Sequence, residues 1–153
     1  TATVEGVKLG LTMNSFAAVS LDPPLVLFSV VRAAHSLAQL EAATAIAINI
    51  LGKDQAPQAE RFAKPLADKW TEVAHTRGLG DAPLLPGTAA TFECVPQARH
   101  DGGDHVIFVV KVVRFTLAAG LVVLGVALRW RNPWLPFIIG MGVLLALRKG
   151  MGW

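Results

Sequence analysis

Apolar and polar positions alternate, or form short apolar runs, along most of the chain up to Arg114, and this pattern predicts strands. In 44–51, isoleucines share one face while small residues and Asn49 share the other, which is the period of two expected for a strand. The run 25–31 is apolar throughout, which is typical of a strand buried on both faces. The predicted strands are 1–4, 8–13, 16–20, 25–31, 44–51, 88–98 and 106–115, with turns at Glu5-Gly6 and within 99–104.

Two short helices are predicted between these strands. Ser36-Leu37-Ala38-Gln39 has the S-x-x-Q form of a capping box, which predicts a helix over 36–43 with Ser36 as its N-cap. A second helix is predicted over 55–70, with an interruption at Pro65, and 77–87 is predicted to be a loop. Strands and helices do not alternate as βαβ units. The expected fold class is therefore mainly β, an antiparallel barrel with short helices rather than a doubly wound sheet.

The C-terminal segment has a different pattern. Two apolar runs, 115–128 and 134–147, are separated by Arg129-Trp130-Arg131-Asn132-Pro133. Each run is shorter than the roughly 20 residues that a membrane-spanning helix needs, yet tryptophans and basic residues flank both, as interfacial anchors do. The pattern predicts a helical hairpin in or on a membrane; the alternative is that the tail supplies the last barrel strands and a buried helix. We expect two regions, a barrel domain over 1–115 and an apolar tail over 116–153.

The amino-acid composition argues against some classes of function and partner. Hydrophobic residues make up 53% of the chain and charged residues 16%, and the apolar excess lies after Arg114. The net charge of +3, without a basic stripe interleaved with aromatics, argues against nucleic acid as a partner. A single cysteine, Cys94, excludes an internal disulfide framework and fits a reducing compartment. Because 1–9 has no signal-peptide core, we expect a cytoplasmic protein, or a membrane-associated one if the tail binds lipid.

The segment from Gly10 to Pro24, GLTMNSFAAVSLDPP, carries the strongest candidate chemistry. Small polar side chains stand in it among apolar ones, which is what a bound ring system with polar edges requires. The alternative is that these residues only form a turn. The polar candidates are Thr12, Asn14, Ser15, Ser20 and Asp22.

Two further segments are candidates for ligand binding. Arg32, His35 and Ser36 come together at a predicted helix start, where free N–H groups, a hydroxyl and an arginine suit a phosphate; the alternative is an ordinary capped helix. Asp104-His105 follows Gly102-Gly103 at a strand entrance, where the histidine can face a second ligand; the alternative is a surface hairpin histidine.

Other classes of site are absent from the sequence. The four histidines do not pair with acidic residues or with Cys94 at metal-ligand spacings, so we predict no metal site. No nucleophile elbow, P-loop or G-x-G-x-x-G motif is present, and Cys94, in a predicted strand, is expected to be a buried, inert thiol. If the chain is an enzyme, its reactive chemistry must belong to a cofactor.

The run GLTMNSFAAVSLDPPLVLFSV resembles the flavin reductase-like family, whose members have an FMN-binding split barrel. The likeness continues through AHS at 34–36, AINIL at 47–51, QAERFA at 58–63, ECV at 93–95 and GGDHVIFVVKV at 102–112, and covers about residues 1–115. These are short-chain NAD(P)H:flavin oxidoreductases that supply two-component monooxygenases.

The resemblance implies a six-stranded Greek-key split barrel that works as a homodimer, with FMN or FAD bound near the subunit interface and NAD(P)H as co-substrate. Hydride would pass from nicotinamide C4 to flavin N5. His105 matches the family's nicotinamide-associated histidine and is the expected catalytic residue. The implied flavin-binding residues are Thr12, Asn14 and Ser15 for the ring and ribityl chain, Phe16 next to them, Ser20 and Asp22 as a second polar cluster, Arg32, His35 and Ser36 near the phosphate, and Asn49 and Leu51 along the flavin.

Two departures from the family pattern are expected to matter. Family members have a helix and most of a strand before the position of Thr1, so the chain is expected to be truncated. They also end with a short strand soon after the position of Arg114, where this chain continues into its apolar tail. Two other functions therefore stay open beside the reductase: a non-catalytic flavin- or haem-binding split barrel, and a membrane-associated protein with a degenerate barrel.

Overall fold

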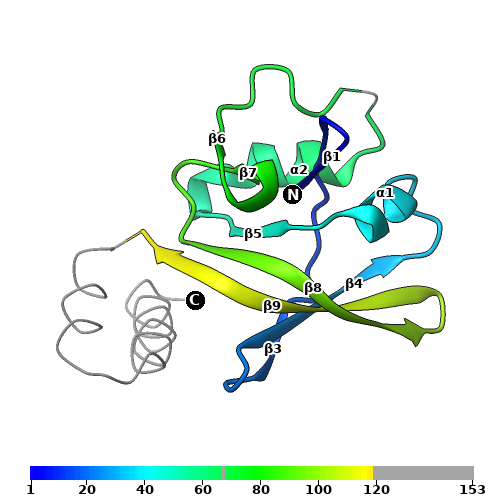
Figure 1. Ribbon diagram of the computed structural model, residues 1–153. Coiled ribbons are helices and arrows are strands. Elements are labelled where there is room, and N and C mark those ends of the chain that lie inside the picture. Colours follow the sequence, from blue (N-terminus) through cyan, green and yellow to red (C-terminus); the bar gives the residue numbers. More distant parts are fainter. Residues whose placement is uncertain (67, 119–153) are drawn as a thin grey trace, which may run out of the picture. The chain divides into compact units, whose positions relative to one another are not determined.

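A five-stranded antiparallel sheet forms the centre of the domain, in a computed structural model that describes residues 1–66 and 68–118 (Figure 1). Its strand order is β3-β4-β9-β8-β5. The long strands β8 and β9 form a hairpin that twists across the sheet (Figure 1). The strands are β3 (Ala17–Ser20), β4 (Leu25–Val31), β5 (Ile46–Ile50), β8 (Ala90–Gly102) and β9 (His105–Leu117). The predicted mainly β, antiparallel fold is confirmed.

A small hairpin precedes the sheet. Strands β1 (Ala2–Val4) and β2 (Val7–Leu9) pair antiparallel, and the turn between them places Glu5 and Gly6 at φ 49° and 80°. The predicted hairpin is confirmed, but the predicted strand over 8–13 is wrong beyond Leu9. Residues 10–14 leave the sheet and are held instead by bonds to α2 and Lys69, from the Thr12 hydroxyl to the Ala59 carbonyl and from the Lys69 ammonium to the Gly10 carbonyl.

The two helices are shorter than predicted. Helix α1 spans Leu37–Ala42, and Ser36 makes no side-chain capping bond, because its φ of −92° and ψ of 5° depart from the extended N-cap geometry. The predicted capping box is therefore wrong. Helix α2 spans Ala56–Ala63 after the short 3₁₀ turn η1 (Lys53–Gln55). It does not reach residue 70, because Lys64 precedes Pro65 and takes an extended ψ of 148°.

The predicted loop over 77–87 contains ordered elements. Strand β6 (Thr76–Arg77) pairs with β7 (Pro83–Leu84), and the turn η2 (Leu79–Asp81) lies between them. The side chain of Glu93 on β8 is buried, and its Oε2 accepts a hydrogen bond from the Leu79 backbone N–H at 2.6 Å. A buried carboxylate needs such a donor, and this bond fixes the loop against the sheet.

The hydrophobic core lies on one face of β4 and β9. Val26, Phe28 and Val30 are each no more than 5% exposed, whereas the intervening Leu25, Leu27 and Ser29 are only half-buried. The expectation that β4 is buried on both faces is therefore wrong. Phe28 and Phe108 face each other across the two strands, and their rings stack with centroids 5.1 Å apart. This pair is the centre of the core.

The apolar tail lies outside the described residues, and so do the predicted hairpin and its alternative. Within residues 1–66 and 68–118, no helix has the length and apolar character that crossing a bilayer takes. In the same part of the chain, no cluster of histidine, cysteine and acidic residues is arranged to hold a metal ion.

Cys94 is expected to be unreactive in the folded protein. Its side chain is fully buried on β8, and burial raises the pKa of the thiol to about 12. Thiol reagents attack the thiolate, so a disulfide reagent at pH 8 should leave Cys94 unmodified until guanidinium unfolds the chain, when the ordinary pKa of about 8.5 returns. The variant Val113→Cys places a thiol at an exposed site of β9 as a positive control. Rapid labelling of the native unsubstituted chain would contradict the prediction.

Candidate functional site

A cavity of about 470 Å³ lies where the loop after β2 meets the start of β9. The loop residues 11–15 form one wall, the end of β4 forms another, and His105 closes the hairpin side. The cavity therefore brings together Thr12, Asn14, Ser15 and His105, which are far apart in the sequence and were predicted as site residues. Leu11, Met13, Val30 and Ile107 supply apolar lining, so the site combines an apolar body with a few polar groups.

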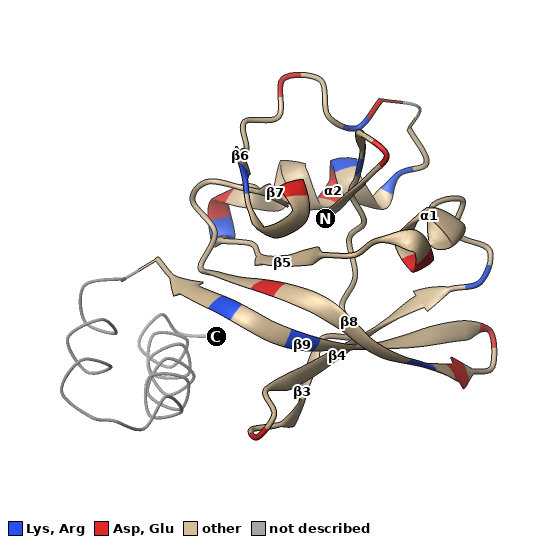
Figure 2. Cartoon of the chain, in the orientation of Figure 1, with Lys and Arg blue, Asp and Glu red and all other residues tan. Residues whose placement is uncertain are grey.

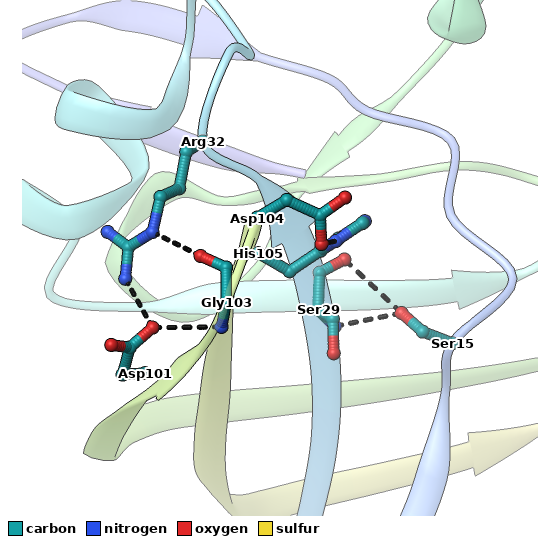
Figure 3. Close-up of polar contacts among 7 residues, drawn as sticks. All are labelled: Ser15, Ser29, Arg32, Asp101, Gly103, Asp104 and His105. Carbon is teal, nitrogen blue, oxygen red and sulfur yellow. Dashed lines mark hydrogen bonds and ion pairs between the residues drawn. The ribbon is translucent and has the colours of Figure 1, made fainter.

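Ser15 fastens the loop to strand β4. Its Oγ accepts a hydrogen bond from the Ser29 backbone N–H at 2.8 Å and donates one to the Ser29 carbonyl at 3.2 Å (Figure 3). The Ser15 hydroxyl is thus occupied within the protein. These two bonds hold the loop against β4.

Unused donors remain along the same loop. Among the described residues, the Asn14 side chain has no hydrogen-bond partner, and the backbone N–H groups of 11–14 donate to no other group of the chain. Backbone N–H groups without partners are costly unless solvent or a ligand satisfies them. Residues 11–14 line a cavity with partly apolar walls, and donors at such a wall suit the acceptor-bearing edge of a planar ring.

Helix α2 holds the other end of the loop. Thr12 Oγ1 donates to the Ala59 carbonyl at 2.6 Å, and the Lys69 ammonium donates to the carbonyls of Gly10 and Phe62 at 3.1 and 2.9 Å. Gly10 lies so close to the Phe62 ring that an added Cβ would stand 2.3 Å from Cδ1. The loop is therefore fixed by Ser29 on one side and by α2 and Lys69 on the other.

Arg32 binds the hairpin turn. Its Nε donates to the Gly103 carbonyl and its Nη2 to the Asp101 carboxylate, both at 2.8 Å (Figure 3). The Asp101 Oδ1 also accepts the Gly103 N–H at 2.9 Å. The hydrogen bond from Arg32, before the one from Gly103, holds the pKa of Asp101 below its usual range. In this arrangement the guanidinium positions the turn that carries His105.

His105 is the polar group at the mouth of the cavity. Its Nδ1 is 2.7 Å from Asp104 Oδ1, and the imidazole is about two-fifths exposed. This hydrogen bond lowers the pKa of the Asp104 carboxyl. A carboxylate that accepts from Nδ1–H leaves Nε2 as the ring atom facing outward, so the pair orients the imidazole for a second ligand.

Asn49, Leu51 and Phe16 belong to an adjoining, more apolar cavity of about 320 Å³ that also contains Thr12. The Asn49 amide is used internally: its Nδ2 donates to Thr1 Oγ1 at 2.9 Å, and its Oδ1 accepts from the Leu85 N–H at 3.0 Å. Asn49 therefore connects β5 to the segment after β7.

The remaining predicted residues are separate from the first cavity. His35 and Ser36 line a third cavity, of about 900 Å³, which adjoins the first at Leu11 and Thr12. Ser20 and Asp22 line none of the three cavities, because they lie at the β3–β4 turn.

Comparison with known proteins identifies the fold family. The family model described as flavin reductase like domain matches residues 1–126. The chain belongs to the flavin reductase-like domain family. Residues 1–115, on which the resemblance was based, lie within this match.

Three relatives of this flavin reductase-like chain are informative. The FMN reductase (NADH) SmoA of Agrobacterium fabrum is 41% identical over 116 residues, which cover 74% of this chain and 65% of the relative. The reductase component of a flavin-dependent trigonelline monooxygenase from Acinetobacter baylyi is 39% identical over 119 residues, 76% of this chain and 38% of the relative. The chain thus spans less than two-thirds of the length of either. The structure of the NADH:FAD oxidoreductase SgcE6 of Streptomyces globisporus, in complex with NAD and FAD fragments, aligns with a TM-score of 0.69 and 37% identity over 72% of this chain and 68% of that one.

Sequence reasoning missed several residues that shape this flavin reductase-like site. Ser29 was treated as part of an apolar strand. A polar residue within such a run could have indicated a contact with another polar segment. Lys69 and Trp70 were assigned to a long helix. No local signal reveals that Lys69 reaches back to Gly10, because that contact spans 59 residues.

Proposed function

We propose that the chain is an NAD(P)H-dependent flavin reductase domain that binds FMN or FAD and transfers hydride to it. The observation that carries the proposal is the cavity that joins the donor-bearing loop 11–15 to His105. The names of the relatives, which include an NADH-dependent FMN reductase and an NADH:FAD oxidoreductase, support the same reaction.

The residues present fit a flavin. The cavity volume of about 470 Å³ lies in the range of small-molecule sites, and its apolar walls suit the faces of a ring system. The Asn14 amide and the unpartnered N–H groups of 11–14 supply donors for the ring's polar edge. When bound, the flavin supplies the hydride-accepting chemistry, and the protein supplies binding and orientation.

The protein's own contribution is positioning. Ser15, Thr12 and Lys69 fix the loop, Arg32 fixes the hairpin turn, and Asp104 orients the His105 ring. Holding two reactants in one geometry is itself a large part of catalysis. We assign His105 to the nicotinamide nucleotide, and Arg32, His35 and Ser36 to the region of the flavin phosphate.

We further propose that the domain works as a homodimer and supplies reduced flavin to a monooxygenase. Strand β3 is an edge of the sheet with exposed residues Ala17 to Val19, which suits a protein neighbour. The trigonelline monooxygenase relative is named as a reductase component. Sedimentation equilibrium of the purified chain tests the dimer.

The experiment that tests the reaction is purification of the chain, addition of FMN or FAD, and measurement of NADH and NADPH oxidation from the nicotinamide absorbance. Flavin-dependent loss of absorbance is expected. Tight flavin binding without oxidation would select the non-catalytic flavin-binding alternative, and the absence of both would refute the proposal.

His105→Ala should raise the KM for the nicotinamide nucleotide about tenfold, because it removes one hydrogen-bonding and stacking group from the cavity mouth. Flavin affinity is the internal reference, measured by fluorescence quenching. His100→Ala, at an exposed position of β8, is the matched control and should leave the kinetics unchanged. Equal kinetics for both variants would remove His105 from the site.

A further inference from the structure

A lysine and a histidine are in contact outside the proposed flavin-binding loop. Lys8 lies on β2 and is exposed, and its ammonium nitrogen is 3.3 Å from Nε2 of His75, in the segment that follows α2. The same nitrogen is 5.7 Å from the centroid of the Trp70 ring, which is within cation–π range. Among the described residues no carboxylate forms an ion pair with Lys8, so the imidazole is the polar group that contacts it.

The hydrogen bonds of His75 fix which of its ring nitrogens carries the proton. Nδ1 is 2.8 Å from the Val73 carbonyl, which can only accept, so Nδ1 holds the hydrogen. An ammonium can only donate, so Nε2 keeps its lone pair toward Lys8. The Trp70 ring packs edge-on against the imidazole, with centroids 5.2 Å apart, and holds it in this orientation. A basic nitrogen is therefore positioned against the Lys8 side chain.

Three other lysines lack a base of this kind. The Lys69 ammonium donates to the carbonyls of Gly10 and Phe62, which do not take up a proton. Lys64 and Lys111 are exposed, and the ammonium of neither makes a hydrogen bond or ion pair within the described part of the chain. Basic positions lie both in the loop that follows α2 and on β9 (Figure 2). Lys111, on β9, is therefore an exposed reference lysine within the same protein.

Lys8 is open to a reagent as well as close to a base. It lines the cavity of about 900 Å³ that also contains His35 and Ser36, so there is space beside its nitrogen for a small molecule. An amine that attacks a carbonyl carbon must lose a proton as the new bond forms, and a neighbouring base speeds that step. Lys8 combines these requirements: an exposed amine, a positioned imidazole nitrogen and room for the reagent.

We propose that Lys8 is a preferred acylation site of this domain, and that His75 acts as the base. The neutral amine of Lys8 attacks the carbonyl carbon of an activated acyl group, such as an acyl phosphate or an acyl thioester. A C–N bond forms, the bond from the acyl carbon to the phosphate oxygen or the thiol sulfur breaks, and the leaving group takes its electron pair. The proton of the Lys8 nitrogen passes to His75 Nε2 and then to water. Acylation removes the positive charge of Lys8 beside Trp70, and nothing is oxidised or reduced.

The test measures the acetylation rate of each lysine when the full 153-residue chain reacts with acetyl phosphate. Peptide mass spectrometry gives the rates at Lys8 and Lys111 in the same sample. Lys8 should react about tenfold faster than Lys111, an effect smaller than an enclosed general base contributes in an enzyme. Because the readout is a modification rate, it does not depend on whether the chain binds flavin, and either result leaves the proposed function undisturbed.

Two variants separate the basicity of His75 from its contact with Lys8. His75→Phe keeps an aromatic ring beside Trp70 and removes both nitrogens, whereas His75→Gln keeps an acceptor that is not basic. Both variants should bring the Lys8 rate down to that of Lys111 and leave the Lys111 rate unchanged. A Lys8 rate that either variant leaves unchanged overturns the role of His75 as base, and with it the proposal.

A parallel reaction with acetyl-coenzyme A, a thioester, identifies the class of acyl donor. Faster reaction at Lys8 than at Lys111 with either donor, lost in both His75 variants, supports the proposal and shows which donor class the site takes. Equal rates at Lys8 and Lys111 with both donors overturn it.

Discussion

Phe108→Ala is expected to lower the free energy of unfolding by about 4 kcal/mol, the largest stability effect of any single substitution discussed. Phe108 is 2% exposed and stacks on Phe28, which is 1% exposed, at the centre of the β4–β9 pair. Removing the ring deletes buried apolar surface and leaves a space that β4 and β9 cannot close, because their backbones are held in register. Urea unfolding, monitored by circular dichroism, measures the decrease in the free energy of unfolding.

The matched control for this prediction is Val113→Ala on the same strand. Val113 is 51% exposed, so its truncation should change the free energy of unfolding by less than about 0.5 kcal/mol. Equal losses for the two variants would mean that the β4–β9 face is not the core. If Phe108→Ala does not fold, Phe108→Leu, which keeps most of the volume, gives a smaller loss in the same direction.

Gly10→Ala is expected to weaken flavin binding by at least about tenfold, the largest effect on the proposed site from a residue that offers no side chain to it. The new Cβ would lie 2.3 Å from Phe62 Cδ1 and 2.4 Å from Cε1. Phe62 is 4% exposed and packed on Trp70, so its ring cannot move aside and the loop must shift. The shift displaces Thr12, and with it the free donors of 11–14. A flavin titration followed by fluorescence quenching measures the loss of affinity.

Two further variants make this result specific. Adding Phe62→Leu to Gly10→Ala removes the ring that clashes and should restore part of the affinity. Gly52→Ala, whose Cβ would meet its nearest atom at 3.2 Å and which lies outside the three cavities, should leave flavin binding unchanged. Full affinity in Gly10→Ala would contradict the view that loop position controls the site.

Local patterns predicted the elements that short-range chemistry controls. The β1–β2 hairpin, the strands β4, β5, β8 and β9, and the start of α2 followed from alternation and turn residues. The length of α2 was overestimated, because the effect of Pro65 on Lys64 was treated as an interruption rather than as the end. The predicted capping box at Ser36 does not form, because a matching sequence does not ensure the extended N-cap backbone that the hydrogen bond requires.

The candidate site, like the fold, was predicted only in part. Residue types alone left a turn and a surface hairpin histidine open as alternatives, and the polar segment and His105 were assigned to the site through the family resemblance; the cavity brings four of the predicted residues together. Arg32 was assigned to phosphate, but its bonds to Asp101 and Gly103 span the distance between β4 and the β8–β9 turn. Its assignment to the phosphate region therefore stays a prediction.

The sequence by itself determined the antiparallel β class and the cluster of small polar residues after Gly10, because period, turn chemistry and residue type act over a few positions. Only the tertiary structure decided which groups are free to bind. The side chain of Ser15 is bound to Ser29, that of Asn49 to Thr1 and Leu85, and that of Lys69 to Gly10, whereas the Asn14 amide has no partner among the described residues. A hydrogen bond between distant residues depends on how the sheet and helices pack, and local sequence does not encode that proximity.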